Sequence, residues 1–175
     1  MSDPIRYPIG PYVLCADPSP ETIQKQLTEM AGSPAALRVA VAGLSNMQLS
    51  TRYRPGGWML CQVVHHLAEA HMNWYSRTKL TLTEERPVVT PWDENTWAEL
   101  ADGRTVEIEP ALVLFEAVCA RWVTLMTSLT PAQWKREMQH PTRGVFVLDS
   151  VLGMHVWHAS HHTAHIIDLR KRMGW

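Results

Sequence analysis

Apolar residues recur every three or four positions along four long stretches of this 175-residue chain. This spacing places apolar side chains on one face of a helix, so the pattern predicts four amphipathic helices. The stretches span residues 19–44, 58–82, 110–129 and 150–173. Their order, with two long connections between them, favours an all-α four-helix bundle with crossover connections.

Local signals refine the ends and interiors of these helices. The Gly-Ser-Pro sequence at residues 32–34 interrupts the first helix, which is predicted to be kinked or to be two short helices in line. Asp149 or Ser150 is predicted to cap the last helix, which should end at Gly174. A capping box predicts a further brief helix at residues 130–134.

The segments between the helices carry signals of their own. Residues 141–144 predict a turn, and the apolar residues 145–148 could pair locally as a small hairpin. Residues 84–109 form a longer connection than packed helices need, and loops of that length tend to be functional or disordered. This connection contains Trp92 and Trp97, and it is expected to fold over another part of the molecule.

Prolines dominate the N-terminal region, at positions 4, 8, 11 and 18. Proline fixes its own backbone and disfavours helix in the residue before it, so residues 1–18 are predicted to be an extended arm on the body of the protein. Residues 19–175 are then expected to form a single four-helix-bundle domain, since their number suits one hydrophobic core.

Composition argues against several classes of protein. The formal net charge is −1 and no basic stripe occurs, so no nucleic-acid partner is expected. The N-terminus lacks the pattern of a secretory signal, and no apolar run approaches the roughly 20 residues of a membrane span. The predicted location is therefore cytoplasmic, with no membrane association.

The three cysteines, Cys15, Cys61 and Cys119, are widely spaced and form no CxxC motif. This pattern argues against a disulfide framework and against a thiolate zinc site. Cys61 and Cys119 are predicted to be small buried residues rather than nucleophiles. Any metal ion would therefore be bound by His, Asp or Glu.

Five of the nine histidines lie in the last predicted helix. His158 and His162 fall on an otherwise apolar stripe, so both are predicted to point into the bundle. His155 lies on the same stripe, either as a core residue or as a neighbour that orients a metal ligand. His161 and His165 share a face with charged residues and are predicted to lie on a solvated face or at a rim.

The second helix carries His65, His66 and His71. Three imidazoles from two facing helices leave coordination positions open on a divalent metal, as a catalytic site requires. Periodicity does not choose between His65 and His66. Glu69, one turn beyond His66, either orients that imidazole or is a solvated surface carboxylate. Because Ala159 takes the place of the glutamate in an HExxH motif, a metalloprotease mechanism is disfavoured.

Several motifs are more specific than periodicity. They are Tyr7-Pro8-Ile9-Gly10, Tyr53-Arg54-Pro55-Gly56-Gly57-Trp58, Gln62-Val63-Val64-His65-His66-Leu67-Ala68, His71-Met72-Asn73, Leu80-Thr81-Leu82-Thr83-Glu84, and Trp157-His158 through His165-Ile166. Together they resemble the YfiT-like metal-dependent hydrolases of the DinB superfamily over nearly the whole chain.

The resemblance implies a four-helix bundle in which three histidines bind one divalent metal ion per chain, zinc or nickel. The ligands that it implies are His66, His158 and His162, and the choice of His66 over His65 rests on the resemblance alone. It also makes a homodimer plausible.

The resemblance leaves three hypotheses for function. The favoured one is hydrolysis, in which a metal-bound water attacks a small-molecule substrate beneath the 84–109 connection. The second is S-transfer, in which the metal holds the thiolate of a low-molecular-weight thiol such as bacillithiol for attack on an electrophile. The third is a catalytically silent domain that binds a metal or a partner. No catalytic residue is assigned, and Glu69 and His155 are the candidates for orienting the metal ligands.

Overall fold

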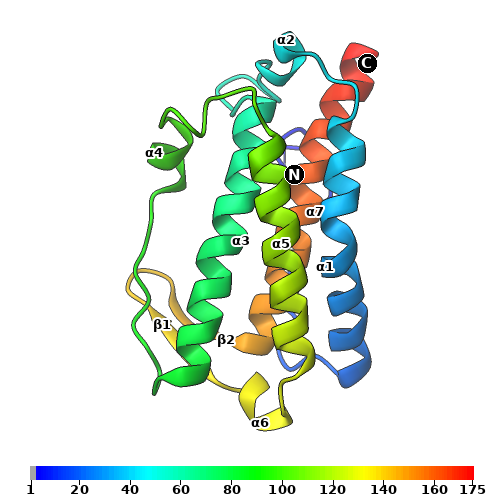
Figure 1. The fold of residues 1–175 in the computed structure, drawn as a ribbon. Helices are drawn as coiled ribbons and strands as arrows, with labels where there is room; N and C mark the ends of the chain where they lie inside the picture. Colours follow the sequence, from blue (N-terminus) through cyan, green and yellow to red (C-terminus); the bar gives the residue numbers. More distant parts are fainter. Residues whose placement is uncertain (1–2) are drawn as a thin grey trace.

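The computed structural model describes residues 3–175 as a bundle of four long helices (Figure 1). The long helices are α1 (Pro20–Val41), α3 (Leu60–Thr83), α5 (Glu109–Thr127) and α7 (Leu148–Met173). The shorter elements are α2 (Asn46–Leu49), α4 (Glu94–Ala98), α6 (Pro131–Trp134), β1 (Glu137–His140) and β2 (Gly144–Val147). The predicted four-helix bundle is confirmed, as are the brief helix α6 and the small antiparallel hairpin of β1 and β2.

Helix α1 is continuous from Pro20 to Val41, with Pro34 in its interior. The alternative of two separate short helices is therefore wrong. Proline removes one hydrogen bond from the helix, here the one to the Met30 carbonyl one turn earlier. Buried side chains before and after Pro34 hold both halves of the helix against the bundle.

Helix α7 begins earlier than predicted. Val147 is its N-cap residue, and Asp149 lies within the first turn, where its carboxylate accepts from the Lys135 ammonium at 2.8 Å. The prediction that Asp149 or Ser150 caps the helix is therefore wrong, because the carboxylate is engaged by a lysine outside the helix. At the other end, Gly174 adopts the left-handed conformation (φ 71°) that ends the helix, as predicted.

Helix α5 packs against α1 and α3 and buries Leu112, Phe115 and Trp122 in the core. It is also the one helix in residues 3–175 that is long and apolar enough to cross a membrane by length and composition. This finding contradicts the expectation that no apolar run approaches the required length. Core helices of globular proteins have the same properties, since one whole face is buried.

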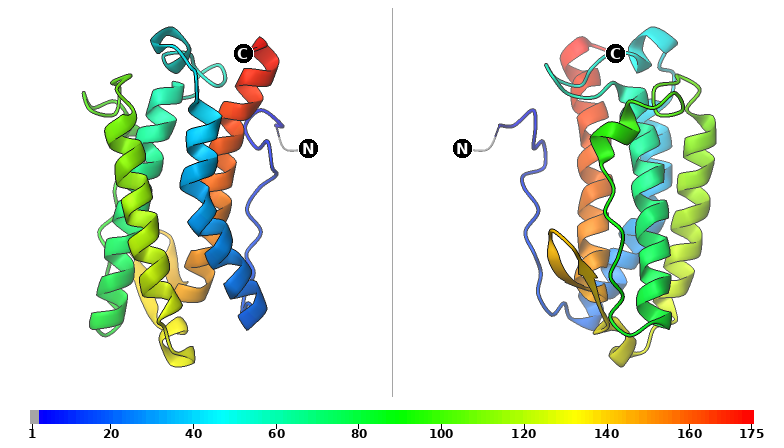
Figure 2. Two further views of the ribbon diagram at one scale, coloured as in Figure 1. Left: turned by 45° about the vertical axis from the view of Figure 1, so that its right-hand side comes forward. Right: turned by 90° about the vertical axis from the view of Figure 1, so that its left-hand side faces the viewer.

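Residues 3–18 run alongside α7 without forming a helix or strand (Figure 2). Two side chains of α7 hold this arm through its carbonyl groups. The Trp157 indole N–H donates to Gly10 at 3.3 Å, and a His165 ring nitrogen pairs with the Arg6 carbonyl at 3.1 Å. The arm therefore covers a face of α7 that the bundle leaves open.

The 84–109 connection folds back along α3, as expected from its length (Figure 2). The Val89 N–H donates to the Gln139 carbonyl at 2.9 Å, which joins the connection to the hairpin. Further along, the Gln62 side-chain amide of α3 donates to the Ala98 carbonyl at 2.6 Å. The arm, the hairpin and this connection together surround the space between α3 and α7.

Candidate metal centre

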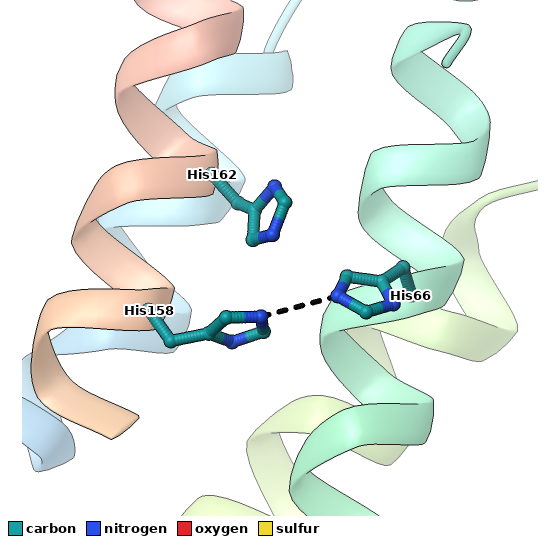
Figure 3. Close-up of side chains that lie close together, drawn as sticks. All are labelled: His66, His158 and His162. Atoms are coloured by element: carbon teal, nitrogen blue, oxygen red, sulfur yellow. Dashed lines mark hydrogen bonds between the residues drawn. The ribbon is translucent and has the colours of Figure 1, made fainter. Parts of the chain in front are cut away.

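Three histidine side chains from α3 and α7 converge between the two helices (Figure 3). His66 comes from α3, while His158 and His162 lie one turn apart on α7. One ring nitrogen of each histidine lies within 4.8 Å of the other two. The structure thus brings together the three residues that the sequence analysis proposes as metal ligands.

The spacing of these nitrogens fits a single metal ion. The Nε2 atoms of His66 and His158 lie 3.1 Å apart, and two nitrogen ligands of a tetrahedral zinc ion are about 3.3 Å apart. The Nδ1 atoms of His66, His158 and His162 are buried, and each lacks a hydrogen-bond partner among the described residues. A set of three imidazoles suits zinc and nickel, which accept nitrogen ligands readily.

Burial keeps these three imidazoles neutral. Desolvation, with a smaller effect of the neighbouring His71, lowers the pKa of His66 to about 3. Desolvation and the surrounding histidines also lower the pKa values of His158 and His162 well below the ordinary value. Because a metal ligand needs a free lone pair, all three rings are in the state that binding requires at neutral pH.

Two tryptophans enclose the His66 ring. The ring of Trp58 lies 4.6 Å from it, and the ring of Trp92 lies 5.7 Å away with an interplanar angle of 20°. Trp92 belongs to the 84–109 connection, and Trp97 packs against it at 4.7 Å. The connection thus places an aromatic wall directly over a candidate metal ligand.

A tight turn positions Trp58 at the start of α3. Gly56 has a positive φ of 67°, which favours glycine. At Gly57, an added Cβ would lie 2.9 Å from the Tyr53 ring. The two glycines therefore allow the close turn that delivers Trp58 to the site.

The three histidines line a pocket of about 580 Å³. Its walls come from α3, α7, the arm, the hairpin and the 84–109 connection, which contribute Arg77, Met154, Tyr7, Thr142 and Trp92 respectively, among others. This volume lies in the usual range for a small-molecule site. The pocket therefore offers room for a substrate beside the candidate metal centre.

A second group of histidines adjoins the first and shares His158. Ring nitrogens of His71, His155 and His158 lie within 4.8 Å of one another. His71 is fully buried, and its Nδ1 lies 2.9 Å from the Leu67 carbonyl, so Nδ1 carries the proton and Nε2 is an acceptor. Both ring nitrogens of His155 are buried without a partner among residues 3–175. This group lies where it can influence the orientation of His158.

His65 and Glu69 do not join the three-histidine group. A ring nitrogen of His65 pairs with the Thr105 carbonyl at 3.1 Å, so His65 holds the 84–109 connection instead. Glu69 is half-buried rather than solvated, and desolvation together with the charge of Asp102 raises its pKa to about 7. No hydrogen bond joins Glu69 to His66 in the described part of the chain, so its role in orienting that imidazole remains a prediction.

His161 and His165 are buried, with 7% and 2% of their surface exposed. The Trp157 ring stacks on His161 at 4.5 Å, and the Tyr53 ring stacks on His165 at 4.1 Å. The alternative of a solvated face is therefore wrong, whereas the alternative of a rim agrees with the place of both residues in the lining of the pocket. Helical periodicity identified a face turned away from the core, but it could not show that the arm and the loop containing Tyr53 cover that face.

The two buried cysteines behave as predicted. Burial raises the pKa of Cys119 to about 12 and also raises the pKa of Cys61. Both thiols are therefore protonated at neutral pH and make poor nucleophiles.

The pocket also contains residues that the sequence analysis did not select, notably Arg54, Arg77 and Arg143. Arg77 follows His66 by eleven positions on α3, which is about three helical turns and places both on one face. That spacing was a usable signal. Arg54 and Arg143 lie in turns, and only the tertiary fold brings them to the pocket.

Comparison with known protein families agrees with this geometry. The family profile described as "DinB superfamily" matches residues 29–166, a range that includes His66, His158 and His162. The chain belongs to the DinB superfamily.

Its DinB relatives are similar over almost their full length. A Geobacillus thermodenitrificans protein named "Putative metal-dependent hydrolase" is 45% identical and is aligned over 99% of this chain and 98% of its own. The Bacillus subtilis protein named "Putative metal-dependent hydrolase YfiT" is 45% identical, with 98% and 97% covered. A solved structure of B. subtilis YfiT, described as having "an unusual four-helix bundle topology", superposes with a TM-score of 0.96 at 44% identity and covers 99% of each chain.

The buried imidazoles predict that the metal-free DinB protein loses stability in mild acid. Their pKa values lie below the ordinary 6.5, so the unfolded chain takes up protons that the folded chain cannot hold. The free energy of unfolding should therefore fall as the pH decreases from about 6.5 toward 4, by about 1.4 kcal/mol per pH unit for each such histidine. Urea denaturation with a chelator at pH 7.5, 6.5 and 5.5 measures this slope.

A matched variant assigns the slope to the histidines. His155→Phe removes one buried imidazole, so stability should depend less steeply on pH than in the wild type. A pH dependence that is the same in both proteins would contradict this account.

Proposed function

We propose that this protein is a metal-dependent hydrolase in which His66, His158 and His162 bind one divalent metal ion, zinc or nickel. The observation that carries the proposal is the convergence of three neutral imidazoles, buried for His66 and His162 and half-buried for His158, with ring nitrogens within 4.8 Å beside a pocket. The names of the two close relatives support the same reaction class. When bound, the metal supplies a Lewis acid that polarises a substrate oxygen and lowers the pKa of a coordinated water.

The surrounding side chains suit this chemistry. Trp58 and Trp92 flank His66 and shield it from bulk water, which strengthens electrostatic interactions at the site. Three protein ligands leave at least one coordination position free, as is usual for catalytic zinc. The pocket beneath the 84–109 connection is then the place where a small substrate would lie.

We also propose that His71 and His155 position the ligand His158. With Nε2 of His158 facing His66, its Nδ1 carries a proton and needs an acceptor. A neutral His155 offers one acceptor and one donor, and Nε2 of His71 offers a further acceptor because the Leu67 carbonyl fixes its tautomer. Hydrogen bonds from His158 to His155 and from His155 to His71, direct or through water, would satisfy every group in this set.

Metal binding is expected to depend on His66 but not on its neighbour. The His66→Ala variant removes a ligand and should weaken zinc or nickel binding by about 100-fold or more, beyond the effect of losing an orienting group. The His65→Ala variant removes an imidazole that bonds to the Thr105 carbonyl and should retain the metal. Competition with a chromophoric chelator measures both affinities, and equal affinity in the two variants would reject the three-histidine site.

Loss of the His71 imidazole should weaken metal binding without removing a ligand. The His71→Leu variant should lower zinc affinity by about 10- to 100-fold, as is typical for groups that orient a ligand. In the zinc-loaded wild type, ¹⁵N chemical shifts should show His71 protonated at Nδ1 and His158 protonated at Nδ1. Wild-type affinity in His71→Leu, or the opposite tautomer of His158, would rule out this role.

Turnover distinguishes hydrolysis from the other two hypotheses. The zinc- or nickel-loaded protein should hydrolyse members of a panel of small esters and amides without added thiol, and His158→Ala should lower kcat/KM by about 100-fold or more. Turnover that requires bacillithiol or glutathione with an electrophilic acceptor would identify an S-transferase instead. Metal binding without turnover on either panel would identify a silent metal-binding domain.

A further inference from the structure

Positive charge is concentrated in the pocket beside the histidines. Four arginines line it, namely Arg6, Arg54, Arg77 and Arg143, whereas Glu94 is the sole acidic residue of its lining in the described part of the chain. The whole chain has a formal net charge of only −1. The excess of guanidinium groups is therefore a local property of the pocket.

Arg77 is the most buried of these arginines, with 5% of its surface exposed. Its guanidinium lies 4.8 Å over the Trp74 ring, and it donates to the Thr90 carbonyl. No carboxylate lies within salt-bridge distance of it among residues 3–175. A buried charge is normally paired, because its desolvation is costly, so Arg77 presents a cation without an anion to the pocket.

Arg6 and Arg54 also contribute positive charge to the pocket. The Arg6 guanidinium lies 5.5 Å from the centre of the Tyr7 ring, and that of Arg54 lies 5.3 Å from the centre of the Tyr53 ring. Stacking of this kind fixes the plane of a guanidinium. Two N–H groups of Arg54 already donate, one to the Tyr53 hydroxyl at 3.2 Å and one to the Pro55 carbonyl at 3.1 Å. Both guanidinium groups therefore contribute positive charge to the lining of the pocket.

Arg143 is the one pocket arginine with an acidic partner. Its guanidinium lies 3.8 Å from the Glu94 carboxylate, a long contact between partly exposed groups. The proximity of Arg143 also contributes, after burial, to lowering the pKa of Arg77. Arg77 and Arg143 both line the pocket, so both cations face the space in which an anion would lie.

We propose that the pocket binds a substrate with an oxyanion group, a carboxylate or a phosphate, and that Arg77 and Arg143 bind this group. Planar guanidinium groups match the geometry of both oxyanions and donate two parallel hydrogen bonds to them. This proposal rests on the proposed function in one respect, because it treats the bound anion as part of the substrate of the hydrolase. The anion site itself does not depend on that function. The aromatic walls formed by Trp58, Trp74 and Trp92 would contact the rest of that molecule.

Calorimetric titration of inorganic phosphate and of succinate tests the proposal on metal-free and on zinc-loaded protein. Arg77→Met should raise Kd for at least one anion by about tenfold or more in both forms, since a charge-assisted hydrogen bond is lost. Arg121→Met, at an exposed position on α5, is the matched control and should leave Kd within about twofold. A preference for phosphate or for succinate identifies the class of oxyanion.

Two further variants change the pocket charge in opposite directions without removing a hydrogen bond to the backbone. Arg143→Met should weaken anion binding. Glu94→Gln should strengthen it, because the variant releases Arg143 and removes the carboxylate that repels the ligand. Misfolding of either variant could only weaken anion binding. Tighter binding by Glu94→Gln therefore cannot arise from damage to the fold.

Three outcomes would overturn the proposal. The first is equal anion affinity in the wild type and Arg77→Met, and the second is no measurable anion binding to the wild type. The third is anion binding that occurs only in the zinc-loaded protein and is unchanged by Arg77→Met. That result would place the anion on the metal. Arg77-dependent binding to metal-free protein supports the proposal even if the chain fails to bind zinc, so failure of the proposed function is distinguishable.

Discussion

The need to keep imidazoles neutral inside the bundle governs much of this structure. His66, His71, His155, His158 and His162 all have pKa values lowered by burial between α3 and α7. A charged ring in this region would lose most of its hydration without gaining an acidic partner. The same condition that makes these residues costly to protonate makes their lone pairs available for a metal ion.

Segments outside the four helices turn this histidine-rich interior into a pocket. The arm covers one face of α7, and the hairpin and the 84–109 connection lie beside α7 and α3 (Figure 2). The connection carries Trp92 onto His66. Two faces of helix α7 therefore carry histidines that are covered by other parts of the chain. His158 and His162 face α3, while His161 and His165 are packed beneath Trp157 and Tyr53.

The helices and two of the three proposed metal ligands could be predicted from periodicity alone. His158 and His162 lie on an apolar stripe, and that local pattern determines the direction of both side chains. The choice between His65 and His66 could not be made in this way, because α3 is buried on nearly all sides. The carbonyl of Thr105, some forty residues away in sequence, engages His65 and leaves His66 to face α7.

The failures at the start of α7 and around the pocket have the same cause, which is contact between distant segments. The N-cap of α7 was mispredicted because Lys135 lies outside the helix and binds Asp149. Arg143 gave no local signal, since its position in the pocket depends on how the hairpin packs. Sequence patterns therefore predict well which face of a helix is buried. They predict poorly the contacts of the loops that complete a site.

The arm has a practical consequence for work on the protein. Arg6 lines the pocket and its carbonyl group pairs with His165, so a polyhistidine tag fused to the N-terminus would bring extra imidazoles close to the candidate metal centre. Such a tag would compete for the same ions and would distort any measurement of stoichiometry. A purification tag without histidines, placed after Trp175, leaves the arm and the metal content of the protein undisturbed.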